Sequence, residues 1–113
     1  MKLHYFDIYG KAEPIRMLCK KANLDFEDNR HTMDTWKPLK ESGWSPTGQL
    51  PVLEMDDGQK LTQCNAIMRL LATQHGLVPK DPMSEYHAES ALIAFEGDFW
   101  GKNQPKLMAA PVE

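Results

Sequence analysis

A turn that leads into a strand beginning with proline is the first feature of this sequence that suggests chemistry. The segment Gly48 to Val52 places Pro51 at the start of a strand, where a backbone N–H is not needed. The proline keeps Leu50 extended. An extended residue beside a loop can hydrogen-bond a short peptide in the manner of a strand. The segment therefore predicts a peptide-binding edge.

The start of a helix further along the chain adds a place for a carboxylate. Ile67, Leu70 and Leu71 repeat with helical spacing, so Gln63 and Cys64 lie at the amino end of that helix. The helix dipole and the unpaired N–H groups there favour a negative charge. Together, the two segments predict a site for the carboxylate of a short peptide.

The two segments are part of a wider pattern in the N-terminal part of the chain. With Tyr5-Phe6 and Ala12 to Arg16, they resemble the glutathione-binding half of a cytosolic glutathione transferase. Lys2 to Phe6, followed by Gly10 to Glu13, is most similar to the sigma class of that family, which uses a tyrosine near the first strand. The resemblance extends from Met1 to about Trp100, and several motifs agree in order and spacing.

The resemblance implies that Tyr5 is the catalytic residue. A tyrosine hydroxyl at the end of a strand can donate a hydrogen bond to a sulfur and favour its thiolate form. Lowering the pKa of a thiol from about 8.5 to about 6.5 requires about 2.7 kcal/mol. One charge-assisted hydrogen bond supplies about 1.5 to 3 kcal/mol, and a helix N-terminus adds about 0.3 to 1 kcal/mol. One hydroxyl therefore suffices. Without the resemblance, Tyr5 would be interpreted as a core residue.

The resemblance also implies which charged and aromatic side chains hold the tripeptide. Trp36 and Lys40, four residues apart on one helix face, would reach the glycine end of glutathione, with Lys40 paired to its carboxylate. Lys11 matches a basic position after the first strand and would tune the Tyr5 hydroxyl or the thiolate by its charge. Asp98 matches an acidic position that reaches the neighbour's glutathione in dimers of the family. The alternative is a packing tryptophan among solvated charges.

The remaining implied contacts come from the two segments described first. Gln49, Leu50 and Pro51 would hold the peptide backbone, with the bond before Pro51 in the cis form. Gln63 and Cys64 would meet the γ-glutamyl carboxylate. The family normally has serine at the second of these positions. A thiol is the weaker hydrogen-bond donor, so the departure predicts weaker binding. The alternative is a reactive Cys64, because helix N-termini favour thiolates.

The elements that position these residues alternate along the chain. Strands are predicted at residues 2–6, 24–28, 51–55 and 60–62. Helices are predicted to begin near Pro14, Asp34 and Gln63. Asp34 is predicted to cap the second of these helices, which would stop at Gly43. Asp57-Gly58 is predicted to form the turn of a hairpin. This thioredoxin-like order, with one crossover between parallel strands, gives an α/β fold class.

The C-terminal part of the chain changes character. Residues 1–76 are expected to form a thioredoxin-like glutathione-binding domain. Residues 77–82 are expected to form a linker, at the end of which Asp81 and Pro82 begin a helix. Residues 83–113 are expected to form the start of an incomplete all-helical domain. The first helix of that domain carries an apolar stripe of Ala88, Ala91, Leu92, Phe95 and Phe99. The stripe and the resemblance together predict a homodimer.

Composition excludes several classes of protein. The chain has 113 residues, 42% of them hydrophobic, enough for one compact core. A net charge of −3 argues against nucleic-acid binding. The sequence shows neither a secretory signal nor a membrane-spanning apolar run, so a cytoplasmic protein without membrane partners is expected. The two cysteines, Cys19 and Cys64, and the four histidines lack metal-ligand spacing, so no metal is expected. The histidines are interpreted as surface or packing residues: His4, His31, His75 and His87.

These patterns favour a glutathione transferase in which Tyr5 activates its co-substrate glutathione for attack on, or isomerisation of, an electrophilic small molecule. The first alternative is a non-catalytic module that binds glutathione or dimerises. The second is a thiol–disulfide reductase that uses Cys64 or Cys19. The reductase is disfavoured because such enzymes place their cysteine at the start of the first helix, where this chain has Ala12 to Pro14.

Overall fold

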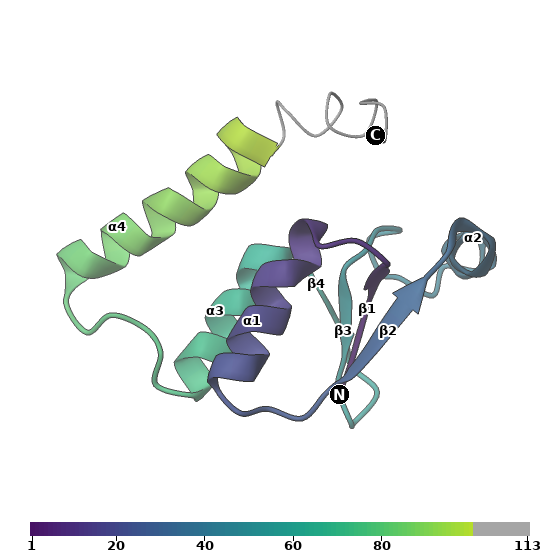
Figure 1. The fold of residues 1–113 in the computed structure, drawn as a ribbon, viewed down its shortest axis with the longest axis horizontal. Coiled ribbons are helices and arrows are strands. Elements are labelled where there is room, and N and C mark those ends of the chain that lie inside the picture. The colour runs from purple at the N-terminus through teal and green to yellow at the C-terminus, as the bar shows by residue number, and fades with distance from the viewer. Residues whose placement is uncertain (101–113) are drawn as a thin grey trace. The chain divides into compact units, whose positions relative to one another are not determined.

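A computed structural model describes residues 1–100 of the chain, with side chains through Gly97. The chain divides into two compact units, Met1–Leu77 and Val78–Glu113 (Figure 1). Within residues 1–100, the first unit carries the sheet, three α-helices and a short 3-10 turn, and the second carries one α-helix and a π-helical segment. Each unit is described here by itself.

A four-stranded mixed sheet forms the centre of the first unit. Its order is β2-β1-β3-β4, from β1 (Lys2–Phe6), β2 (Glu27–His31), β3 (Val52–Glu54) and β4 (Lys60–Thr62). β1 pairs with β2 in parallel and with β3 antiparallel, and β3 and β4 form the hairpin predicted around Gly58. This is the thioredoxin-like arrangement expected from the sequence, and the α/β fold class is confirmed.

Two helices cover one face of this sheet, and the hydrophobic core lies beneath them. α1 (Glu13–Lys21) and α3 (Cys64–Gln74) lie side by side, whereas α2 (Met33–Glu41) lies on the other side of the strands (Figure 1). The fully buried side chains come from β1, β3, α1 and α3: Leu3, Leu53, Ile15, Cys19, Ile67 and Leu71. Alternation along β1 therefore sends Leu3 and Tyr5 to this core and His4, which lies between them, to the opposite face.

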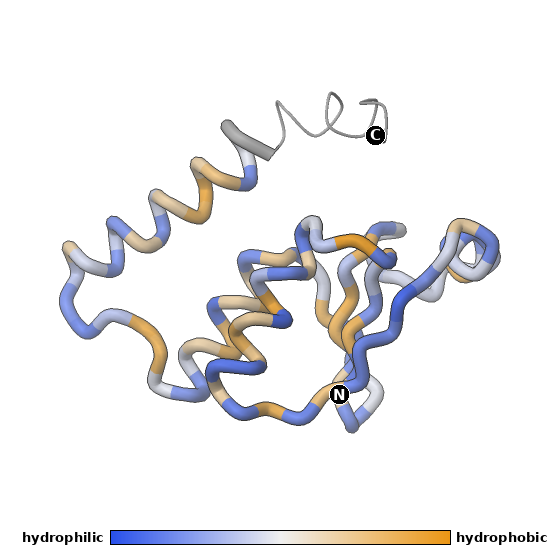
Figure 2. The backbone as a smooth tube through the Cα atoms, viewed as in Figure 1, coloured by the Kyte–Doolittle hydropathy of each residue, from blue (hydrophilic) through white to orange (hydrophobic). Residues whose placement is uncertain are grey.

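The second strand lies further along the chain than the sequence predicted. Leu24 and Phe26 pack against the core but precede the strand, since the Leu24 N–H donates to the Cys19 carbonyl at the end of α1. β2 itself is Glu27–His31, and Figure 2 shows it as hydrophilic along most of its length. β2 is an edge strand in which only His31 is buried, so it lacks the apolar alternation on which the prediction relied.

The second helix also begins differently from the prediction. Its N-cap is Thr32, not Asp34. The Thr35 N–H donates to the Thr32 hydroxyl at 3.2 Å, and the Thr32 N–H donates to the Thr35 hydroxyl at 2.9 Å, which is a reciprocal capping box. Asp34 lies in the first turn, where its charge suits the helix dipole. Threonine at the N3 position in place of the usual glutamate hides this signal in the sequence.

The second unit begins with the helix that the sequence predicted. α4 (Pro82–Ile93) has Asp81 as its N-cap, with the Ser84 N–H 2.9 Å from the Asp81 carboxylate, and continues into a π-helical segment, η2 (Ala94–Trp100). Its apolar residues are not confined to the expected stripe. Tyr86 and Ile93, seven residues apart, are exposed on another side of the helix. Phe99 lies outside the described side chains. No helix within the described residues is long and apolar enough to cross a membrane.

Candidate functional site

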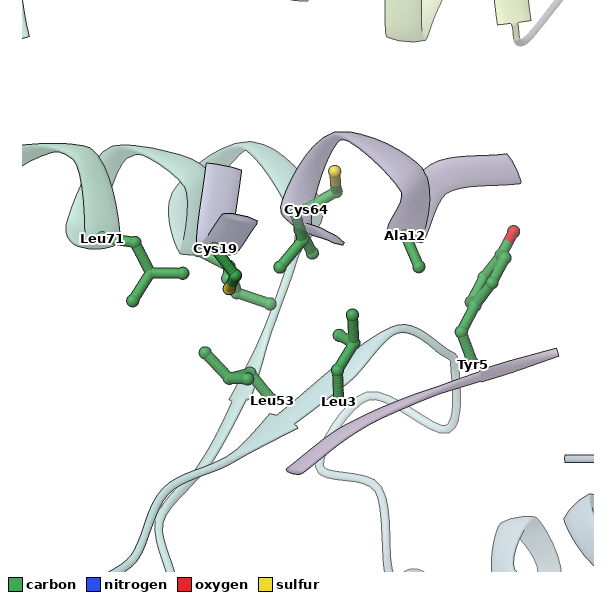
Figure 3. Close-up of a cluster of buried hydrophobic side chains, with 9 residues drawn as sticks. Leu3, Tyr5, Ala12, Cys19, Leu53, Cys64 and Leu71 are labelled. Carbon is green, nitrogen blue, oxygen red and sulfur yellow. The ribbon is translucent and has the colours of Figure 1, made fainter. Parts of the chain in front are cut away.

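Tyr5 lies at the edge of the core, where β1 ends. Its ring is buried, and its hydroxyl points away from Leu3 and Leu53 (Figure 3). The hydroxyl oxygen accepts a hydrogen bond from the Lys11 N–H at 3.2 Å. Within residues 1–97, no hydrogen bond has this hydroxyl as its donor. The oxygen is therefore oriented by the main chain, and its own hydrogen remains available for a ligand.

Gly10 allows the main chain to approach the tyrosine this closely. It opens the short 3-10 turn η1 (Gly10–Ala12) with φ of +45°, a left-handed conformation that suits glycine. A Cβ atom added to Gly10 would lie 2.5 Å from the Tyr5 hydroxyl oxygen. The turn that presents the Lys11 N–H to the tyrosine thus depends on the absence of a side chain at Gly10.

Arg16 holds the loop that joins β1 to this turn. The buried guanidinium donates to the Ile8 carbonyl at 2.9 Å and forms ion pairs with Glu13 at 3.0 Å and Asp28 at 3.1 Å. It also lies 6.0 Å from the centre of the Tyr5 ring. The sequence prediction gave Arg16 no role of its own. The sequence did contain a signal for a structural role of Arg16, because this arginine lies next to the buried stripe of α1 and has acidic residues near it.

The amino end of α3 meets the same turn. The Cys64 thiol donates to the Lys11 carbonyl at 2.9 Å, so the main chain of Lys11 contacts both Tyr5 and Cys64. Figure 3 shows the Cys64 sulfur and the Tyr5 hydroxyl both directed away from the core leucines. Gln63, which precedes α3, is exposed and has a φ of +73°. A left-handed backbone at a residue other than glycine is strained and often marks a functional position.

The loop before β3 brings the predicted peptide-binding edge to Tyr5. His4 pairs with Val52, and continuing this antiparallel register places Pro51 beside Tyr5. The Leu50–Pro51 bond is cis, as the resemblance implied. The loop is shaped by buried Ser45, whose hydroxyl donates to the Gln49 carbonyl at 2.8 Å and accepts from the Gln49 N–H at 3.2 Å. Ser45 is a second contributor that the sequence prediction missed.

α2 holds Trp36 and Lys40 on a separate part of the unit. Trp36 is buried and packs edge-on against the Phe6 ring at 6.4 Å, while Lys40 is exposed. A surface pocket of about 480 Å³ is lined by five α2 residues: Met33, Trp36, Lys37, Lys40 and Glu41. Trp36 therefore packs against Phe6 and also lines the pocket. Asp98 lies in η2, and its side chain is outside the described residues.

A polar network around two buried histidines, on the opposite face of the sheet, was also missed. His4 and His31 were interpreted as ordinary surface or packing residues, but their Nδ1 and Nε2 atoms are 3.0 Å apart. His4 Nε2 is 2.9 Å from the Glu54 carboxylate, and His31 Nδ1 is 3.4 Å from the Thr35 hydroxyl. We call Glu54, His4, His31 and Thr35 the histidine network. Its members lie far apart in the sequence, so only strand pairing brings them together.

Comparison with known proteins identifies the family. Residues 1–73 match the family model described as "Glutathione S-transferase, N-terminal domain". The chain belongs to the glutathione S-transferase family. Glutathione S-transferase 1 of Ascaris suum is 43% identical over 104 residues, which cover 92% of this chain and 48% of that protein.

Solved structures of glutathione S-transferases agree with this assignment. A transferase of the hookworm Necator americanus, described as monomeric, has a TM-score of 0.83 and 39% identity over 99% of this chain and 55% of its own. A sigma-class enzyme of Fasciola hepatica has a TM-score of 0.80 and 32% identity over 97% of this chain and 52% of its own. The resemblance to sigma-like transferases is confirmed, and the chain spans about half the length of these relatives.

Proposed function

We propose that this chain binds glutathione and activates its thiol with Tyr5 for attack on, or isomerisation of, electrophilic small molecules. The observation that carries the proposal is the Tyr5 hydroxyl, which accepts from the Lys11 N–H and keeps its own hydrogen for a ligand sulfur. Accepting this bond also makes the hydroxyl a better donor, because hydrogen bonds in series polarise one another.

The surrounding residues would orient the tripeptide. The extended backbone at Leu50, between Gln49 and cis-Pro51, would pair with the peptide, and the amino end of α3 at Gln63 and Cys64 would bind the γ-glutamyl carboxylate. Their proximity to Tyr5 follows from the β1–β3 register and the Lys11 contacts. Orientation next to a stabilised thiolate is the source of the expected rate gain.

Four charged or aromatic positions complete the proposed site. Trp36 and Lys40 would hold the glycine carboxylate from the pocket on α2, and Lys11 would add positive charge near the thiolate. Asp98 would serve the glutathione of a neighbouring subunit. The homodimer that this role needs, a cytoplasmic location and a part in detoxification are proposed on the family resemblance.

A non-catalytic glutathione-binding module is the second candidate function. It would use the same Leu50–Pro51 loop and the same start of α3 to bind glutathione, without activation of the thiol by Tyr5. Retention on glutathione-agarose, combined with a conjugation assay, separates the two functions, since the module would be retained without conjugating. The reductase alternative is weakened at Cys19, because burial raises the pKa of that thiol and disfavours the thiolate.

The variant Cys64→Ser is expected to bind glutathione about fivefold more tightly. At present the thiol donates to a neutral carbonyl, that of Lys11. A serine hydroxyl turned to the γ-glutamyl carboxylate would replace a neutral bond worth about 0.5 to 1.5 kcal/mol with a charge-assisted bond worth about 1.5 to 3 kcal/mol. The net gain of about 1 kcal/mol is about fivefold in affinity. Calorimetric titration under reducing conditions measures it. Equal or weaker binding by the serine variant would mean that Cys64 fits by shape or acts in thiol chemistry.

Self-association through the second unit is a further expected result. α4 and η2 expose large apolar side chains: Met83, Tyr86, Ile93 and Phe95. Apolar surface of this extent is seldom left in water, and two-fold pairing is the commonest way to cover it. At micromolar concentration the chain should sediment as a dimer or a larger species. A sharp monomer boundary together with weak binding of a hydrophobic dye would contradict this expectation.

A further inference from the structure

We infer that the histidine network positions α2, and with it Trp36 and Lys40, for the binding of glutathione in a pH-dependent way. The inference rests on the proposed function, because it concerns the helix that would hold the glycine carboxylate. It assigns a role to His4 and His31 that neither the sequence pattern nor the family resemblance gave them.

The network connects the sheet to the first turn of α2. Glu54 lies on β3, His4 on β1 and His31 at the end of β2, and the three are joined by contacts of 2.9 and 3.0 Å. The last contact, 3.4 Å from His31 to Thr35, reaches the residue that forms the capping box of α2. Beyond this polar connection, the packing of Trp36 against Phe6 holds the same helix.

When both rings are neutral, the contacts of the two histidines have one consistent direction. His4 Nε2–H donates to the Glu54 carboxylate, and His31 Nε2–H donates to His4 Nδ1, which leaves His31 Nδ1 as an acceptor toward Thr35. The single Thr35 hydroxyl hydrogen is shared between His31 Nδ1 at 3.4 Å and the Thr32 carbonyl at 3.1 Å. With both rings charged, two N–H groups would face each other across the 3.0 Å contact. A charge on His31 alone would lie buried at the amino end of α2, where the helix dipole disfavours a cation.

The surroundings of His31 do not compensate such a charge directly. His4 is its nearest titratable neighbour, and the Glu54 carboxylate is reached only through His4. On the far side of His4, the Trp44 ring packs at 4.7 Å and in turn carries the Lys60 ammonium at 5.4 Å, while α2 contributes Asp34 in its first turn.

Burial, followed by the charge of His4, lowers the pKa of His31 below its ordinary value of 6.5. The state in which α2 is in place and His31 is buried therefore binds fewer protons than a state in which His31 is exposed to water. The stability of the first state relative to the second is greatest above about pH 6.5 and decreases as the pH falls below that value.

Two measurements on the whole chain test the inference at about pH 7.5 and about pH 5.5. The first is calorimetric titration with S-methylglutathione, which lacks a thiol and so removes any titration at Tyr5. The second is amide hydrogen exchange of α2, corrected for intrinsic rates, with α1 as the internal reference. We expect S-methylglutathione to bind about three- to tenfold more weakly at the lower pH. We also expect α2, but not α1, to lose protection there.

Two variants separate a positioning role from a general structural role. His31→Gln keeps a donor for His4 but does not titrate, so its affinity should change by less than about twofold between the two pH values. His75→Gln replaces an exposed histidine at the end of α3 and should follow the unmodified chain.

Each outcome decides the inference. An unchanged affinity of the unmodified chain across the two pH values, or the same pH dependence in His31→Gln, would overturn it. If S-methylglutathione binds at neither pH, the proposed function fails instead. The exchange of α2 in the unmodified chain then still decides the inference, without a ligand and without a variant that must fold.

Discussion

Tyr5→Phe is expected to leave glutathione affinity within about twofold while reducing the reactivity of the bound thiol by about 10- to 150-fold. The affinity is retained because the γ-glutamyl and glycine ends are held elsewhere in the proposed site. The reactivity falls because the variant lacks the hydroxyl, and a charge-assisted hydrogen bond is worth about 1.5 to 3 kcal/mol. Calorimetry gives the affinity, and the rate of reaction of bound glutathione with a thiol-selective electrophile gives the reactivity.

Tyr9→Phe is the matched control for this experiment. Tyr9 lies four residues from Tyr5 in the loop after β1, and 74% of its surface is exposed. Its loss should change neither affinity nor reactivity. If the two phenylalanine variants react with the electrophile at the same rate, Tyr5 has no part in activating the thiol.

Gly10→Ala is expected to destabilise the fold by about 1 to 3 kcal/mol and to displace the Tyr5 hydroxyl. The added methyl group would lie 2.5 Å from the hydroxyl oxygen and 2.8 Å from a ring carbon, so either the ring or the turn must move. In both cases the Lys11 N–H loses its alignment with Tyr5. Urea unfolding measures the stability, and the electrophile assay measures the consequence for the site.

Gly76→Ala separates backbone strain from the clash. Gly76 also has a positive φ, +68°, but a Cβ there would meet no atom within 4 Å. The Gly76→Ala variant should be less stable than the unmodified chain but should keep the reactivity of bound glutathione. If Gly10→Ala keeps full reactivity, the close approach of the turn to Tyr5 is not needed for the site.

Local sequence signals were sufficient for most of the helices and strands in both units. The apolar alternation of β1, the helical spacing of α1 and α3, the Asp57-Gly58 turn and the Asp81 cap all predicted the elements that form. β2 was misplaced because an edge strand made of polar residues carries no alternation. The cap of α2 was misassigned because aspartate is preferred to threonine at the N-cap, which favoured Asp34 over Thr32.

The candidate site was predictable where the chemistry is local and was not where it depends on the fold. Pro51 and Cys64 pointed to a binding site through their local sequence context, and the family resemblance added Tyr5. The connection of Tyr5 to Cys64 through the Lys11 main chain appears only when η1 and α3 meet. The roles of Arg16 and the histidine network depend on pairings between distant residues. Propensity and spacing do not encode such pairings.

Ultraviolet titration of the thiolate of bound glutathione tests the central claim most directly. If Tyr5 and the amino end of α3 stabilise the thiolate, the bound thiol should ionise about two pH units below the value of about 8.5 that is usual for a thiol. In Tyr5→Phe this titration should move back by about one to two units. A bound thiol that ionises in the unmodified chain at the same pH as free glutathione would contradict the account.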